Sequence, residues 1–214
     1  MIRTSIVGLG DISSVHLQAI KSLPGACLTA ACDIDPEKKK LLKGDVHFYT
    51  DMDRMLAEEK PDCVHICLPH YLHYPAALKA AQAGVNIFAE KPLAMDMDEA
   101  RKYMKLEEAY GVKICISLQN RVNPTTICLK QMLDSGDYGA VTGMRGVVTW
   151  YRNREYFEVK PWRGSMKLAG GGCMMNQSVH TLDLMQYLAG SPSSQIHGNV
   201  GQILDYGIEV EDTA

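Results

Sequence analysis

The sequence predicts an α/β protein in which a doubly wound parallel sheet is followed by a second, α+β domain. Through residue 117, short apolar runs alternate with segments of helical periodicity. Short continuous apolar runs are typical of parallel strands that are buried on both faces. A glycine-rich turn follows the first run, and the alternation stops after Asn120. We therefore expect one domain at residues 1–119 and another at residues 120–214.

Six strands are predicted in the first domain, each rich in Val, Ile, Cys and Ala, at residues 4–8, 28–33, 46–49, 63–68, 85–89 and 113–117. Helices are predicted between them at residues 12–22, 37–42, 52–59, 74–83 and 96–110. Asp35 and Asp51 stand where helix N-caps are expected, and Gly84 and Gly111 stand where helices end. Because right-handed crossovers join parallel strands, this order implies a doubly wound sheet.

The second domain has a different pattern. A helix is predicted at residues 124–134 and another, opened by a glycine run, at 170–188, with strand-like stretches at 141–151, 195–204 and 208–214. This order predicts an open, mostly antiparallel sheet. The last stretch stops in mid-pattern, so we expect the sheet to be truncated here and the domain to be incomplete.

Composition excludes several classes of protein. The 214 residues are 46% hydrophobic and 22% charged with a net charge of −3, and no large Lys/Arg cluster indicates a nucleic-acid or membrane partner. No apolar run reaches the roughly 18 residues of a membrane span, so we expect a soluble, cytoplasmic protein. The seven cysteines are interpreted as reduced core residues. Cys63 and Cys67 lie too far apart along a strand to share a metal ion, and no metal is expected.

The stretch after the first predicted strand has the pattern of a phosphate-binding turn. Gly8, Gly10 and Ser13 form G-x-G-x-x-S between a strand and a helix. The glycines permit a tight turn and close approach of the backbone to a pyrophosphate, which the helix N-terminus would attract. Asp11 and Ile12 belong to the same predicted cofactor site. The alternative is a purely structural glycine turn.

Asp33 ends the second predicted strand, a little over twenty residues beyond the glycines. A carboxylate at this place can accept hydrogen bonds from both ribose hydroxyls and repels a 2′-phosphate, which favours NAD. NADP stays possible because three lysines follow at residues 38–40. The alternative role for Asp33 is a cap for the helix that begins near Pro36.

Two further segments carry candidate catalytic groups. Lys91 follows the fifth predicted strand, where doubly wound sheets bind ligands, although a solvated loop lysine is the alternative. Asn176, His180 and Asp183 fall on one stripe of the predicted helix at 170–188. Short polar groups of these types suit a fixed hydrogen-bond arrangement, either in a binding site or in a polar seam between domains.

Several stretches together resemble the Gfo/Idh/MocA family of nicotinamide-dependent oxidoreductases, which act mainly on sugars and cyclitols. They are "GLGDISSVH", "PHYLHYPAALKAAQAGVNIFAEKPL", "WRG" and "GGGCMMNQSVHTLD", in this order over nearly the whole chain. The resemblance implies an N-terminal Rossmann domain, a C-terminal domain with a large open sheet, and a homo-oligomer, dimer or tetramer, formed through that sheet.

The resemblance also implies roles for single residues. Lys91 and His180 would act on the substrate hydroxyl, and the peptide between Lys91 and Pro92 is often cis in such proteins. The cofactor would lie near Pro69, His73, Glu90 and Lys91, with Arg163 near the active cleft.

Asn176 departs from the family pattern, because many members have Asp at this position. An amide can orient the imidazole of His180 or bind a substrate hydroxyl, but it cannot stabilise an imidazolium by charge. Asp183 is either the partner of His180, a substrate ligand, or a structural anchor. A further stretch supplies Arg152, Arg154, Tyr156 and Trp162, a mixture suited to stacking on a sugar and binding a carboxylate or phosphate, with a domain-packing loop as the alternative.

The expected reaction is hydride transfer between a secondary alcohol of a sugar, cyclitol or sugar derivative and the nicotinamide of NAD(P). His180 would exchange the hydroxyl proton, because its ordinary pKa lies near neutrality, and Lys91 would stabilise alkoxide character. The alternative is a dinucleotide-binding redox sensor of the same fold that performs no turnover.

Overall fold

The structure, a computed structural model, describes all 214 residues. The chain divides into two compact units, Met1–Ser117 and Leu118–Ala214. Each unit has its own internal contacts.

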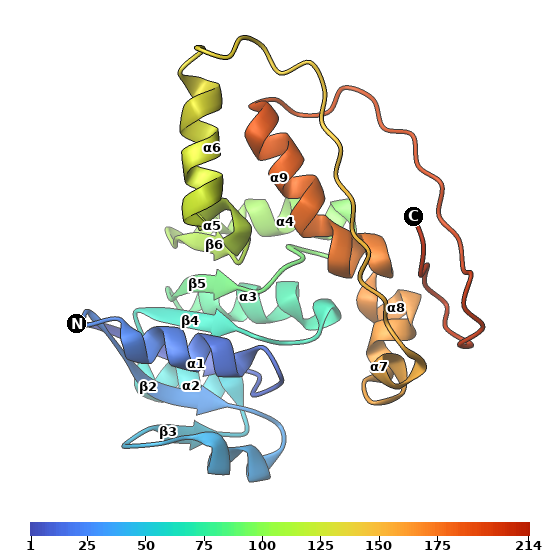
Figure 1. The fold of residues 1–214 in the computed structure, drawn as a ribbon. Helices are drawn as coiled ribbons and strands as arrows, with labels where there is room; N and C mark the ends of the chain where they lie inside the picture. The colour runs from blue at the N-terminus through green and yellow to red at the C-terminus, as the bar shows by residue number, and fades with distance from the viewer. The chain divides into compact units, whose positions relative to one another are not determined.

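The first unit is built on six parallel strands (Figure 1). Their order is β3-β2-β1-β4-β5-β6, so the direction of winding changes between β1 and β4. The strands are β1 (Ile2–Val7), β2 (Ala26–Cys32), β3 (His47–Tyr49), β4 (Cys63–Ile66), β5 (Asn86–Ala89) and β6 (Ile114–Ile116). In doubly wound sheets ligands bind outside the carboxyl ends of the strands at this change of direction.

Helices connect these strands. They are α1 (Ser13–Ser22), the 3₁₀ helix η1 (Pro36–Leu41), α2 (Met52–Glu59), η2 (His70–Leu72), α3 (His73–Gln82), α4 (Met97–Met104) and α5 (Leu106–Tyr110). Two apolar clusters form the core, one with side chains of α2, α3 and α5 and a smaller one beside α1. The two clusters lie on opposite faces of the sheet. Successive side chains of a strand point to opposite faces, and in β1 Ile6 belongs to the smaller cluster and Val7 to the larger.

The predicted doubly wound sheet is confirmed, and all six predicted strands form within a few residues of their expected bounds. Two helices differ from the prediction. The segment after Asp35 is a 3₁₀ helix, and the helix expected at residues 96–110 is interrupted at Lys105. Tyr103 and Leu106 are both buried on either side of the break. A tighter turn brings residues three apart onto one face, which lets both side chains reach the core.

The second unit is helical wherever it has regular structure. It contains η3 (Gln119–Val122), α6 (Pro124–Asp134), α7 (Arg154–Glu158), η4 (Pro161–Gly164), α8 (Met166–Ala169), the π-helix η5 (Met174–Ser178) and α9 (Val179–Ala189). Gly172 lies against the chain near Glu211, where a Cβ atom would collide with the Glu211 carbonyl oxygen. Cys173 N donates to that oxygen at 2.9 Å. The glycine run before η5 thus lets the C-terminal segment pack closely.

The antiparallel sheet expected in the second unit does not form in these 214 residues. The stretches at 141–151 and 195–204 appear as long tubes without strand arrows (Figure 1), and the only pairing there is one bridge between Gly201 and Thr213. A strand needs a hydrogen-bonded neighbour along its length, and the two stretches do not supply one to each other. None of the helices in the chain has both the length and the apolar character required to cross a membrane.

Candidate functional site

The first element of the site is the glycine turn after β1. Gly8 has φ of +89°, and a Cβ atom there would collide with the carbonyl oxygen of Cys67. Its N–H donates to Cys32 O at 2.8 Å, which binds the turn to the end of β2. Glycine is therefore required both by the backbone conformation and by the neighbouring chain.

The turn leads directly into α1 through Gly10, Asp11 and Ile12. Ser13, at the position where a third glycine is common, is buried and donates from Oγ to Gly10 O at 2.5 Å. The small side chain closes the turn on itself and lets α1 approach the sheet. The N-terminus of α1 thus follows the carboxyl end of β1 after a short turn, an arrangement that suits a pyrophosphate.

Asp33 is fixed beside this turn. Its Oδ2 accepts a hydrogen bond from Leu9 N at 2.7 Å, and its Oδ1 accepts one from Asp35 N at 2.9 Å. The residue that caps η1 is Asp35, whose side chain accepts from Glu37 N, so Asp33 is not the helix cap. Each carboxylate oxygen keeps a second acceptor site for a ribose hydroxyl. The residues present therefore fit the adenosine end of NAD.

Glu90 and Lys91 follow β5 at the same edge of the sheet. The peptide between Lys91 and Pro92 is cis. Glu90 N donates to Ile66 O at 3.0 Å, and Glu90 Oε1 lies 2.9 Å from His16 Nε2. Burial raises the pKa of the Glu90 carboxyl, but hydrogen bonds from His16 and Ser117 outweigh it, and the net pKa lies below its ordinary value. Glu90, the residue before Lys91, is therefore ionised and is bound by the side chains of His16 and Ser117.

The histidine that holds Glu90 also contacts a second histidine. His16 Nδ1 and His65 Nδ1 are 2.9 Å apart, and both rings pack against Phe88. Burial, followed by the proximity of His16, lowers the pKa of His65 to about 4, so His65 is neutral at pH 7. When neutral His65 carries its proton on Nδ1, it donates to Nδ1 of His16. His16 then carries its own proton on Nε2 and donates it to Glu90. No catalytic motif pointed to these two histidines.

His73 was expected near the cofactor, together with Pro69. Pro69 precedes η2 at the edge of the sheet, but the ring of His73 is buried, only 1% exposed. Its Nδ1 lies 2.8 Å from Pro92 O and its Nε2 lies 2.8 Å from Leu68 O. His73 thus joins the segment after β4 to the one after Lys91, and its contacts are to backbone carbonyls.

In the second unit, Asn176, His180 and Asp183 were predicted to form one polar stripe, but Asn176 and Asp183 bind different side chains. Asn176 lies on the π-helix η5, where the spacing of an ordinary helix fails, and its Nδ2 donates to Tyr156 Oη at 2.7 Å. Asp183 lies on α9 and binds Arg121 through two hydrogen bonds, of which the one from Nε is 2.8 Å long. His180 is buried on α9. The contact with Arg121 supports the structural role for Asp183 that the sequence left open.

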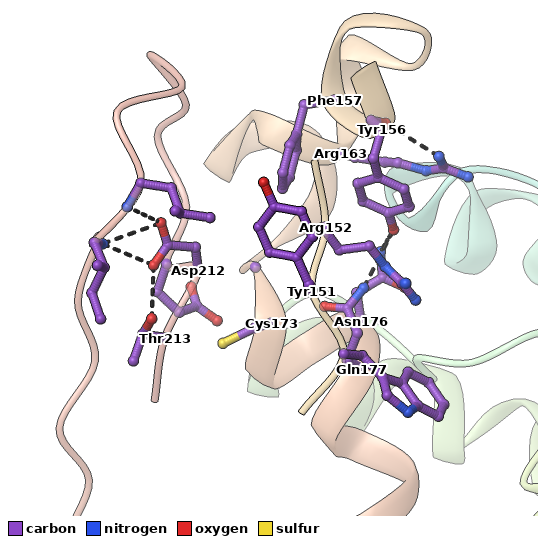
Figure 2. A pocket seen from close by; sticks show the side chains of 15 residues that line it. Tyr151, Arg152, Tyr156, Phe157, Arg163, Cys173, Asn176, Gln177, Asp212 and Thr213 are labelled. Atoms are coloured by element: carbon purple, nitrogen blue, oxygen red, sulfur yellow. Dashed lines mark hydrogen bonds between the residues drawn. The ribbon is translucent and has the colours of Figure 1, made fainter. Parts of the chain in front are cut away.

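Asn176 also lines a cavity of about 240 Å³ that lies wholly within the second unit (Figure 2). Arginine and aromatic side chains form one side of it. Arg152 and Arg163 lie over the ring of Tyr156, with Cζ 5.0 and 4.1 Å from its centroid. Trp162 is not part of the lining, although Arg163 lies 5.9 Å from its ring. The cavity thus contains Arg152, Arg163 and Asn176 of the predicted site residues.

The opposite side of the cavity is acidic. Asp212 Oδ2 accepts from Ile203 N at 3.1 Å and from Leu204 N at 2.8 Å, while Glu211 Oε1 accepts from Met174 N at 3.0 Å. Tyr156 belongs to the arginine-rich stretch that the sequence singled out, whereas Glu211 and Asp212 were not predicted as site residues. The two acidic residues lie more than thirty positions from η5 along the chain, and no local pattern marks that contact.

Six parallel strands with a glycine turn and a fixed carboxylate at their carboxyl edge define a dinucleotide-binding protein of the Rossmann type. Residues 2–118 match the family model described as "Oxidoreductase family, NAD-binding Rossmann fold", and residues 127–214 match the GFO/IDH/MocA C-terminal domain. The chain therefore belongs to the GFO/IDH/MocA family. The expected family and NAD as the cofactor of its Rossmann domain are confirmed.

Several proteins to which the chain is similar are named dehydrogenases. The chain is 28% identical over 198 residues to the D-glucoside 3-dehydrogenase of Escherichia coli, a match that covers 90% of this chain and 55% of that protein. A solved structure of the WlbA dehydrogenase from Bordetella pertussis in complex with NADH and UDP-GlcNAcA superposes with a TM-score of 0.90 at 30% identity, covering 99% of this chain and 64% of that one. The structure of the myo-inositol 2-dehydrogenase from Lactobacillus plantarum superposes with a TM-score of 0.76 at 26% identity, covering 88% of this chain and 56% of that one. The chain spans about half the length of the curated relatives it matches.

Proposed function

We propose that this protein is an NAD-dependent dehydrogenase that acts on a secondary alcohol of a sugar, a cyclitol or a sugar derivative. The observation that carries the proposal is the carboxylate of Asp33, held 2.7 Å from Leu9 N beside the glycine turn. This geometry suits a ribose with free hydroxyls and disfavours a 2′-phosphate. The named relatives, which act on glucosides and inositols, supply the class of substrate.

The residues have separate tasks in this proposal. The turn at residues 8–12 binds the pyrophosphate through backbone N–H groups, and Asp33 binds the ribose. When bound, the nicotinamide accepts or donates the hydride. His180 takes the proton from the substrate hydroxyl, and Lys91 stabilises the negative charge that develops on its oxygen. Asn176 orients the substrate or the imidazole through its amide.

The remaining predicted residues are assigned to support these groups. Glu90 keeps a negative charge next to Lys91, and His73 and Pro69 shape the backbone on which the nicotinamide end would rest. Asp183, bound to Arg121, anchors α9 rather than touching the substrate. Arg152 and Trp162, with Arg163, belong to the substrate side of the site.

The test is a screen for NADH absorbance with NAD and a panel of sugars, inositols and nucleotide-sugars. His180→Ala and Lys91→Met should each abolish most of kcat while NAD affinity, measured by titration, is retained. The matched controls are His197→Ala and Lys43→Met, which change exposed residues of the same types. NAD binding without turnover of any substrate would favour the alternative of a non-catalytic redox sensor. Full activity in both site variants would overturn the roles given to His180 and Lys91.

The proposal includes a homo-oligomer formed through the second unit, and a cytoplasmic location. Large apolar side chains are exposed along the extended segments of that unit, which is unusual for a surface in contact with water alone; they include Val147, Trp150, Ile196, Val200 and Ile203. Light scattering of the purified protein tests the oligomer, and cell fractionation tests the location.

A further inference from the structure

The contact between the imidazoles of His16 and His65 has no task in the cofactor turn or in the proposed reaction. His16 Nδ1 and His65 Nδ1 lie 2.9 Å apart, and His16 Nε2 lies 2.9 Å from Glu90 Oε1. A hydrogen bond between two ring nitrogens holds one proton, because one nitrogen must donate and the other must accept. The three side chains therefore form a hydrogen-bonded chain that ends at the residue before Lys91.

The proton between the two rings can belong to either of them, and the two arrangements differ in charge. If His65 donates it, His16 is neutral and carries its own proton on Nε2, facing Glu90. If His16 donates it, His16 is an imidazolium, because the Glu90 carboxylate needs the Nε2 proton as well. Burial and then the proximity of His16 lower the pKa of His65 to about 4, so His65 is neutral at pH 7 in both arrangements.

The surroundings of Glu90 favour the neutral arrangement. The side chains of His16 and Glu90 are only 6% and 12% exposed. Burial raises the pKa of Glu90, but His16, Ser117 and Lys91 together hold it below its ordinary value. With His16 neutral, the charges of Glu90 and Lys91 balance. An imidazolium would add a second positive charge beside one carboxylate, and an uncompensated charge is costly where water is excluded.

Two other titratable side chains are affected by the charge of Glu90. They are Cys67, after β4, and His73 of α3. Burial and then Glu90 raise the pKa of the Cys67 thiol, and burial lowers the pKa of the His73 imidazole. Both side chains are therefore uncharged near pH 7. Lys91 and a protonated His16 are the two cations that could balance this carboxylate.

We propose that His65 is a positioning residue for Lys91: its Nδ1 proton fills the contact with His16, keeps His16 neutral, and leaves the charge of Glu90 to the Lys91 ammonium. An ionised carboxylate favours the charged form of a neighbouring amine. Lys91 would thus enter the reaction as a cation, the form that stabilises negative charge on a substrate oxygen. The inference deepens the proposed function, on which the role of Lys91 rests.

NMR of protein labelled with ¹⁵N-histidine tests the charge arrangement, since long-range ¹H–¹⁵N correlations report which ring nitrogens carry protons. At about pH 6, just below the ordinary pKa of histidine, wild-type His65 should be protonated on Nδ1 and His16 on Nε2 alone. Variants that lack one histidine assign the signals. A doubly protonated His16 in the wild type, or a proton on His65 Nε2 alone, would overturn the inference without any further variant.

Two substitutions at His65 separate hydrogen bonding from packing. His65→Leu keeps an apolar side chain against Phe88 but removes the donor, so His16 should take up a second proton at about pH 6. His65→Asn places an amide donor near the position of Nδ1 and should return His16 to a single proton. If His65 served only to fill space, Leu would replace it better than Asn. Phe88→Leu changes the packing of both rings and should leave the protons where they are.

The charge of Lys91 is read from its rate of acetylation, followed by mass spectrometry over a range of pH, because only the uncharged amine reacts. A second cation beside Glu90 should make Lys91 lose its proton about one pH unit lower in His65→Leu, which is about tenfold faster acetylation at a fixed pH. Lys43, an exposed lysine of the same molecule, should react equally in all samples, and His197→Leu should match the wild type. Unchanged acetylation of Lys91 in His65→Leu would overturn the inference.

These measurements need no turnover, so they separate the inference from the proposed function. If no sugar, inositol or nucleotide-sugar of the panel yields NADH, the dehydrogenase proposal fails, while NMR and acetylation still decide the charge arrangement. If NADH forms, His65→Leu should lower kcat several-fold with little change in KM, and His65→Asn should recover most of it. Equal kcat in the wild type and His65→Leu would overturn the positioning role and leave the dehydrogenase standing.

Discussion

His16 Nε2 lies 2.9 Å from Glu90 Oε1, so a side chain of α1 is bound to the residue that precedes Lys91. The two side chains are 6% and 12% exposed, which makes this a largely buried contact. Removing one member of a buried pair is costly because the other is left without a partner in a medium of low dielectric. The contact also fixes the backbone on which Lys91 is carried.

The variant His16→Leu should lower the free energy of unfolding by about 3 kcal/mol, as expected when a buried carboxylate loses its partner. Chemical denaturation monitored by circular dichroism measures the change. Glu90→Gln should cost less, because the Gln side-chain oxygen can still accept from His16 without a buried charge. If the free energy of unfolding falls no more in His16→Leu than in Glu90→Gln, the His16 imidazole does not stabilise the buried Glu90 carboxylate.

His65 predicts a specific dependence of stability on pH. Its pKa falls from 6.5 to about 4 in the folded state, chiefly because of burial. Between these values the unfolded chain binds a proton at this residue and the folded protein does not, so stability rises with pH through this window and is lost as pH falls from 6.5 toward 4. The slope contributed by one proton is at most about 1.4 kcal/mol per pH unit.

Unfolding measured at several pH values tests this dependence. His65→Gln should reduce the slope between pH 4 and 6.5 because it removes the titrating group. His197→Gln is the matched control at an exposed histidine and should leave the slope as it is in the wild type. An identical slope in both variants would assign the acid sensitivity to other groups, such as His73, whose pKa burial also lowers.

Much of the first unit could be predicted because its signals are local. Short apolar runs bounded by caps and glycines predicted every strand, and Gly8 and Asp33 stand where the pattern placed them. The break at Lys105 could not be predicted, because it depends on how Tyr103 and Leu106 reach a core made by distant strands. His16 was missed for the same reason, since its partners lie 49 and 74 residues away.

The second unit shows where periodicity stops being sufficient. The wheel that aligned Asn176 with His180 assumed an α-helix throughout, but Asn176 lies on a π-helical turn. Alternating polar and apolar residues predicted strands at 141–151 and 195–204, yet a strand exists only where another pairs with it. Tyr156 became part of the site through contacts with Asn176 and two arginines that no spacing in the sequence encodes.

Asp33 should determine the preference between the two nicotinamide cofactors. Asp33→Asn keeps an acceptor for Leu9 N but removes the negative charge that opposes a 2′-phosphate. Titration should show weaker NAD binding and stronger NADP binding, with the ratio of the two affinities shifting by about tenfold, as for the loss of one charge contact of about 1.4 kcal/mol. Asp45→Asn, at an exposed residue before β3, is the control. An unchanged ratio in Asp33→Asn would mean that the carboxylate does not face the ribose.

The pair between Arg121 and Asp183 separates a structural role of Asp183 from a catalytic one. The Arg121 side chain is 43% exposed and that of Asp183 is 13% exposed, so solvent screening reduces the energy of the pair to about 0.5–1 kcal/mol. Asp183→Asn and Arg121→Gln should each destabilise the protein by about this amount, and the double variant should lose little more than either single one.

If Asp183 only anchors α9 to the segment of η3, Asp183→Asn should lower the melting temperature slightly and leave kcat of the proposed reaction nearly unchanged. A group that orients His180 or binds substrate would behave differently, since its loss would change kcat or KM without a matching loss in Arg121→Gln. Kinetics of both single variants under one set of conditions therefore decides between the two roles. Equal and small kinetic effects in both would assign the pair to structure, as its bidentate geometry favours.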